Sequence, residues 1–197
     1  RNVNPKQKLQ DYKIDNQYFL DAGDLRVRRH LSRIVGELVS RYPSLDGVQF
    51  DYIRYPDKEP HYGYTRMNMR RFKKAAGLQT IEDDGKAWKD WKRRQVNELV
   101  HLLSWEVRKI NPRLKVAASV LAPYSRAYHE AFQEWNLWVE KKWVDFVIVM
   151  SYSPDSNQVQ HLILDAQKRV TNQKNVSIGI WAEERSKVKE LAVFDRQ

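Results

Sequence analysis

Apolar residues follow two different periods along this chain. Between residues 24 and 43 they repeat at helical spacing, which predicts an amphipathic helix that Asp24 caps and Pro43 ends. Short β-rich runs predict four strands, at 48–53, 114–121, 144–150 and 176–181. Helical patterns fill the other segments, at 66–76, along the segment that Pro112 ends, around Tyr128 to Trp135, at 157–170 and from about Ser186.

Strands that alternate with helices are typical of βαβ units and a parallel sheet, so the predicted fold class is α/β. The run 144–150 is almost continuously apolar, which favours a strand buried on both faces. The first interval between strands is the longest, because residues of about 55–85 are inserted after the strand 48–53. In a parallel sheet this insertion follows the C-terminal edge, where α/β proteins hold their active sites, so it is expected to line a pocket.

Composition and charge add broad limits. The 197 residues, 42% of them hydrophobic, fit one globular domain with a substantial core. A formal charge of +10 favours an acidic partner if one surface carries most of it. The longest apolar run, 146–150, is too short for a membrane span. The chain opens on Arg1 without a signal-peptide core, so we expect that its natural beginning has been removed.

The residue types present disfavour metals and nucleotide cofactors. The chain has no cysteine, and its five histidines form no pair spaced to bind a metal from one helical face. Its seven glycines form no phosphate-binding loop of the dinucleotide or P-loop kind. We therefore expect neither a metal site nor a cofactor.

The most specific string in the chain is D-G-V-Q-F-D-Y-I-R-Y-P at 46–56. It resembles the signature of the glycosyl-hydrolase-like 10 family of bacterial TIM barrels, in which such a run forms strand four. The surroundings are also similar to that family, with L-D-A-G-D at 20–24, G-Y at 63–64, W-x-x-W-K-R-R-Q at 88–95 and W-V-D-F-V-I-V-M-S-Y at 143–152.

The resemblance implies a (β/α)8 TIM-barrel type of fold, apparently incomplete, of which this chain supplies about strands four to seven. Residues 1–197 would form a single partial domain with the insertion at about 55–85. A complete barrel usually needs about 250 residues, so the other strands are expected to be absent from this chain. The edge strands are then expected to contact another chain or the rest of a longer protein.

Cleavage of a glycosidic bond generally uses two carboxyl groups, one to protonate the leaving oxygen and one to act as nucleophile or to activate water. Asp51, near the C-terminal end of the strand 48–53, is the candidate nucleophile or base. Its structural alternative is to cap the following loop or to pair with Arg54. Arg54 could keep Asp51 ionised, contact substrate hydroxyls or form a purely structural ion pair.

The sequence offers two candidates for the second carboxyl group. Asp155 follows the strand 144–150 and Glu183 follows the strand 176–181, both on the expected face of the sheet. Each has the alternative role of a solvated loop charge. Asp57 and Glu59, in the insertion, rank below them.

Several aromatic and basic residues are candidates for substrate binding, because an aromatic ring can cover the apolar C–H face of a sugar and leave its hydroxyls to polar partners. Tyr152, at the end of the third strand, could donate its hydroxyl to a sugar. The full set of candidates is Arg54, Tyr52, Tyr64, Trp88, Trp91, Arg94, Tyr152 and Trp181.

The favoured hypothesis is a glycosidase that acts on a bacterial envelope or extracellular polysaccharide, neutral or anionic, with Asp51 at its centre. The resemblance also favours an extracytoplasmic location. The alternative is a non-catalytic glycan-binding module, or an inactive fragment of such a barrel. A nucleic-acid binder is disfavoured, because the basic residues are scattered over every helix and no nucleic-acid-binding motif is present.

Overall fold

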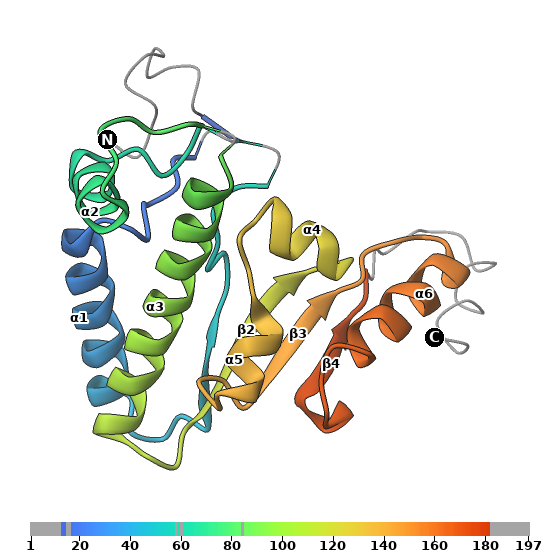
Figure 1. Cartoon of the computed structure of the whole chain (residues 1–197). Coiled ribbons are helices and arrows are strands. Elements are labelled where there is room, and N and C mark those ends of the chain that lie inside the picture. The colour runs from blue at the N-terminus through green and yellow to red at the C-terminus, as the bar shows by residue number, and fades with distance from the viewer. Residues whose placement is uncertain (1–12, 15–16, 58, 60, 84, 182–197) are drawn as a thin grey trace.

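A computed structural model of the chain describes residues 13–14, 17–57, 59, 61–83 and 85–181. Four parallel strands form one sheet in the order β1-β2-β3-β4 (Figure 1). The strands are β1 Gly47–Phe50, β2 Lys115–Leu121, β3 Phe146–Met150 and β4 Val176–Gly179. The helices are α1 Leu25–Arg41, α2 Arg66–Ala76, α3 Lys86–Ile110, α4 Tyr124–His129, α5 Trp135–Glu140 and α6 Ser156–Gln167, with a 3-10 turn at Gln173–Asn175.

Local capping signals define two of these helices. The Asp24 side chain caps α1 by accepting the backbone N–H of Arg26, as the sequence predicts. Thr65 caps α2 in the same way, and Gly77 ends it in the left-handed conformation that glycine adopts without strain. The prediction of a helix over 66–76 is therefore confirmed.

The two faces of the sheet differ. On one face, Val116, Ala118 and Val120 of β2 are fully buried in a core shared with α3 residues such as Val96 and Val100. On the other face, the Gln49 side chain donates to Ser119 Oγ across the β1–β2 pair at 2.7 Å. Burial along β3 alternates between full and partial. On this second face, Ala117, Ser119 and Leu121 of β2 are buried as well, whereas the β3 residues are only partly buried. The predicted burial of the strand 144–150 on both faces is therefore full on one face and partial on the other.

The segment 124–140 differs from the single predicted helix. It forms α4 and α5, separated by a link in which Phe132 has a left-handed φ of 59°. Inside this link the buried Gln133 side chain accepts the N–H of Leu121 and donates to the carbonyl of Ser119. Satisfying these β2 groups requires a non-helical link. The predicted helix near Ser186 lies outside the described residues.

Candidate functional site

Asp51 lies directly after β1 at the C-terminal edge of the sheet. Its side chain is exposed, and its Oδ1 accepts the backbone N–H of Tyr52 at 2.8 Å. Within the described part of the chain no ion pair engages this carboxylate. A solvent-facing, negatively charged oxygen is thus available at the position where the sequence predicts the reacting carboxyl group.

The backbone after Asp51 turns sharply, so β1 ends at Phe50 and not at residue 53 as predicted. Tyr52 has a φ of 52°, in a region that non-glycine residues rarely occupy, and its carbonyl accepts the N–H of Arg54 at 2.8 Å. Strained residues of this kind cluster at functional sites. The turn leaves the Tyr52 ring 58% exposed beside Asp51.

The Arg54 guanidinium lies 4.3 Å above the Tyr52 ring. Its Nε and Nη1 atoms are buried and have no hydrogen-bond partner among the described residues. Burial lowers the pKa of Arg54, and the negative charges of Asp57 and Asp51 offset part of this effect. Arg54 therefore holds a positive charge with unused donors next to the Asp51 carboxylate.

A pocket of about 380 Å³ opens beside this turn. Its walls are mainly apolar and come from residues 17–20, from α1 and α3 side chains that include Leu31, Val35, Leu99 and Leu103, and from the end of β1. Asp51 is the one carboxylate among its described lining residues, and Tyr52 and Arg54 line it as well. The pocket therefore places Asp51 and Arg54 against a surface that could cover the apolar face of a ligand.

The ends of the other strands contribute further predicted residues to this edge. After β3, Tyr152 is 59% exposed. Its ring lies beside Gly179 of β4, where an added Cβ would be 3.6 Å from the ring edge. Trp181 follows β4 and is 44% exposed. Asp155 is exposed and caps α6 by accepting the N–H of Asn157. Glu183 lies outside the described residues.

Asp57 has a structural role in this arrangement. Its carboxylate accepts from Arg126 Nε at 2.9 Å and from Arg126 Nη2, which ties the insertion to α4. The carboxylate of Asp57 is therefore engaged in joining two elements of the fold.

Three predicted stacking residues are buried instead of facing the site. Trp88, Trp91 and Tyr64 are 1%, 6% and 5% exposed, and they form a small core with Phe72 of α2. No ring face is open to a sugar, so the expected stacking role conflicts with their position. Their packing holds α2 against the N-terminal half of α3. Arg94 is exposed, with its guanidinium 5.3 Å from the centre of the Trp91 ring.

Asp21 is a buried residue close to the candidate site, and sequence reasoning gave it no role there. It is 1% exposed, and its two oxygens accept from the Tyr55 hydroxyl, from Asn68 Nδ2 and from the hydroxyl and N–H of Thr65. Burial, together with the Asp21 charge, raises the pKa of Tyr55 well above its usual value. The L-D-A-G-D string at 20–24 was the sequence signal that could have pointed to Asp21, because it forms the turn that precedes the Asp24 cap of α1.

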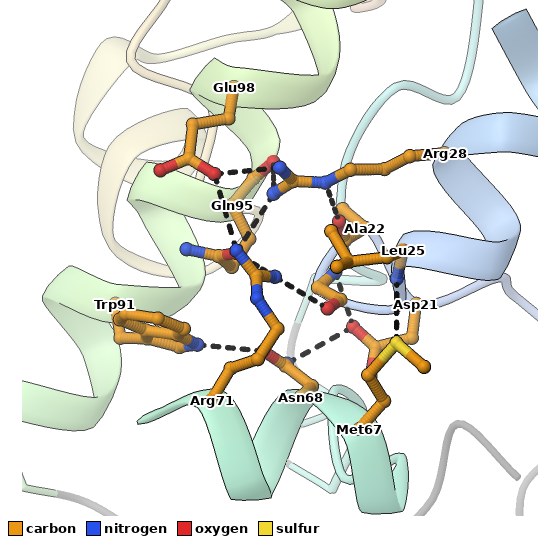
Figure 2. Close-up of polar contacts among 11 residues, drawn as sticks. Asp21, Ala22, Leu25, Arg28, Met67, Asn68, Arg71, Trp91, Gln95 and Glu98 are labelled. Atoms are coloured by element: carbon orange, nitrogen blue, oxygen red, sulfur yellow. Dashed lines mark hydrogen bonds and ion pairs between the residues drawn. The ribbon is translucent and has the colours of Figure 1, made fainter. Parts of the chain in front are cut away.

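Figure 2 shows how this carboxylate connects three elements. Asn68 lies between Asp21 and Trp91 and accepts from Trp91 Nε1 at 2.7 Å. Arg28 and Arg71 meet at Gln95 of α3, and both donate to its Oε1 at 2.8 Å. A side chain at Gly23 would collide with Asn68, so a glycine is needed there. The network fixes α1, α2 and α3 around the base of the insertion.

Within the described ranges no group of three or more His, Cys, Asp or Glu residues is arranged to hold a metal ion. None of the described helices is long and apolar enough to cross a membrane.

The fold and the site define a class: an α/β domain with a four-stranded parallel sheet and an exposed aspartate at the C-terminal edge, consistent with part of a TIM-barrel-like glycosyl hydrolase. The model of the family Glycosyl hydrolase-like 10 matches residues 3–197. The chain therefore belongs to this family, and the resemblance carried by the 46–56 string is confirmed at the level of the family.

Curated relatives agree with this assignment. The chain is similar to the protein named Glycosyl hydrolase DigH from Escherichia coli strain K12, with 27% identity over 155 residues, covering 72% of this chain and 33% of that protein. The proteins of the same name from Escherichia coli O157:H7 and Shigella flexneri match with the same identity and coverage. The chain thus spans about a third of the length of the curated relatives it matches.

Proposed function

We propose that the chain is part of a glycoside hydrolase that acts on a bacterial envelope or extracellular polysaccharide, with Asp51 as the nucleophile or base. The observation that carries this proposal is the exposed Asp51 carboxylate after β1, on a strained turn beside a pocket. Family membership and relatives named glycosyl hydrolases support the reaction class.

The chemistry follows from where charge develops. In the transition state the sugar carbon gains positive character, and the Asp51 carboxylate can stabilise it, attack it or take a proton from the attacking water. Arg54 places a positive charge near Asp51 and has two buried donors to offer to a substrate. Tyr52, Tyr152 and Trp181 expose rings along the same edge, where they can cover sugar faces.

Asp155 and Glu183 remain the proposed sources of the second carboxyl group. Asp155 engages Oδ1 in capping α6, which leaves Oδ2 available for a proton. The two free edges of the sheet, at β1 and β4, are proposed to pair with further strands of a longer polypeptide, and residues from those strands would complete the site.

The second candidate function is a non-catalytic glycan-binding module. One observation favours it: among the described lining residues of the pocket, Asp51 is the one carboxylate, whereas hydrolysis generally uses two. A binding module would keep the exposed aromatic rings and would bind glycan without releasing reducing ends.

The test is Asp51→Asn in the full-length polypeptide, because Asn keeps the shape of the side chain and removes its charge. Release of reducing sugar from a bacterial envelope polysaccharide is expected to fall by on the order of hundredfold or more, while glycan binding persists. The matched control is Glu37→Gln, which removes a carboxylate from an exposed α1 ion pair and leaves turnover at the wild-type level. Wild-type turnover by Asp51→Asn would contradict the catalytic proposal.

A further inference from the structure

The outer face of α2 carries cations that pair with nothing in the described structure. Arg66, Arg70 and Lys74 are all exposed, and no hydrogen bond or ion pair engages their side chains among the described residues. They are spaced four residues apart, so they form one row along the helix. We call Arg66, Arg70 and Lys74 the α2 strip.

Part of the strip carries an electrostatic cost to its own helix, although Lys74 lies in the last turn, where the helix dipole favours a cation. Like charges four residues apart on a helix repel each other, and Arg66 places a positive charge in the first turn, where the helix dipole disfavours it. The first turn of α2 holds no acidic residue that would offset this. A row of charges that carries this cost and makes no described contact points to a role outside the fold.

Two other basic residues near α2, Arg71 and Arg93, are engaged inside the protein. Arg71 turns inward to Gln95 Oε1 and the Gly23 carbonyl. Arg93 is buried, donates to Asp90 and the Tyr128 carbonyl, and lies 3.6 Å from the Tyr128 ring. The α2 strip is therefore a row of exposed cations on one helix face, and Arg71 and Arg93 are not part of it.

We propose that the α2 strip binds a linear anionic polysaccharide, as a surface separate from the Asp51 pocket. Arg66 and Lys74 are separated by about 12 Å along the helix axis, with a cation roughly every turn, which suits an extended chain with repeated negative charges. The choice of a polysaccharide rests on the proposed function, since α2 belongs to the insertion that follows Asp51.

Two features favour a polysaccharide over other polyanions. Helix α2 exposes no large apolar side chain that would enter a lipid bilayer. Its one amide side chain, Asn68, is buried in the Asp21 network, so the outward face carries no amide to read a base edge. The same network ties α2 to Tyr55, so a polymer held on the strip is at a fixed distance from the turn that carries Asp51.

The test compares two triple variants with the same change in charge. R66Q/R70Q/K74Q removes the strip. R113Q/K141Q/K168Q removes three exposed cations that follow α3, α5 and α6, near the N-terminal ends of the strands. The probe is polygalacturonate at low salt, with dextran as the neutral polymer. Affinity for polygalacturonate is expected to fall by about tenfold or more in the strip variant and little in the control, and wild-type binding is expected to weaken as salt rises.

Neither a change in stability nor a loss of catalysis would explain the expected fall in affinity for polygalacturonate. The strip variant is expected to melt at or above the wild-type temperature, because it removes repulsion and replaces exposed residues with a good helix former. Binding is measured in the Asp51→Asn background as well, so a failure of the proposed hydrolysis leaves the binding result intact. Equal losses in the two triple variants would overturn the proposal. Strip-dependent binding to duplex DNA or phosphatidylglycerol vesicles instead of polygalacturonate would also overturn it.

Discussion

Arg54 combines a cost to stability with the ligand-binding role proposed for it. Two of its nitrogen donors are buried without a partner among the described residues, and such groups cost folding free energy. A structural ion pair with Asp51, one of the alternatives the sequence left open, is absent among the described contacts. The geometry favours a guanidinium held ready for an incoming oxygen.

Arg54→Met is therefore expected to separate function from stability. Removing the two unsatisfied donors offsets the loss of the contact with the Tyr52 ring, so the melting temperature is expected to stay the same or rise. The KM for the glycan is expected to rise by about tenfold, since hydrogen bonds to a charged donor are lost. Calorimetry and steady-state kinetics check this, and a large fall in melting temperature with unchanged KM would assign Arg54 a structural role.

Among the elements, α1 depends on the charge of its cap. Asp24 is buried, accepts the N–H of Arg26 and pairs with the Arg26 guanidinium. The hydrogen bond from the Arg26 side chain lowers the pKa of Asp24 below its ordinary value of 3.8, although burial opposes the shift. A carboxyl group with a lowered pKa stabilises the fold above its unfolded pKa, and this stabilisation is lost as the pH falls through the folded pKa.

Two substitutions separate the cap from its charge. Asp24→Ala removes both and is expected to cost about 1 kcal/mol of unfolding free energy at neutral pH. Asp24→Asn keeps a cap acceptor, so its smaller deficit relative to wild type is expected to shrink as the pH falls below about 3.8. Chemical denaturation over a pH series measures this difference. A deficit that stays constant to low pH would mean that the Asp24 charge does not stabilise α1.

The elements also show what sequence reasoning can and cannot predict. Helix α2 was predicted with its bounds, because Thr65 and Gly77 are local signals whose effect needs no distant contact. One helix was predicted around Tyr128 to Trp135, because nothing local reveals that the Gln133 side chain bonds to the backbone of β2. Trp88 and Trp91 were assigned to substrate stacking, since their spacing on α3 does not indicate that Phe72 of α2 covers them.

At the candidate site, the sequence located Asp51 because its motif is continuous along the chain. The Asp21 network was not predicted, because it joins residues from positions 21, 55, 65 and 68 that meet only after folding. The parallel order of the four strands followed from the alternation of elements. The sequence did not predict what covers the outer strands β1 and β4, because such cover would come from outside the four-stranded sheet.

For the whole molecule, the strands at the two edges of the sheet are expected to be less protected from local unfolding than the central strands. Strands β2 and β3 each pair on two sides, whereas β1 and β4 each pair on one side within the described sheet. The chain alone is expected to show slow amide hydrogen exchange in β2 and exchange about tenfold or more faster in β1. Mass spectrometry of deuterated peptides measures this. Equal protection of β1 and β2, with a dimer in sedimentation, would show that a second copy covers the edge.

The Asp21 carboxylate has a consequence for the segment that follows the Asp51 turn. The chain leaves it at Tyr55 and returns to it at Thr65, so the segment between them starts and finishes on one buried anchor. Between these two ends, Asp57 pairs with Arg126, and Tyr62 and Tyr64 are buried. The segment is therefore a loop whose two ends share one carboxylate, so Asp21→Ala is expected to loosen the turn after β1 and the start of α2 together.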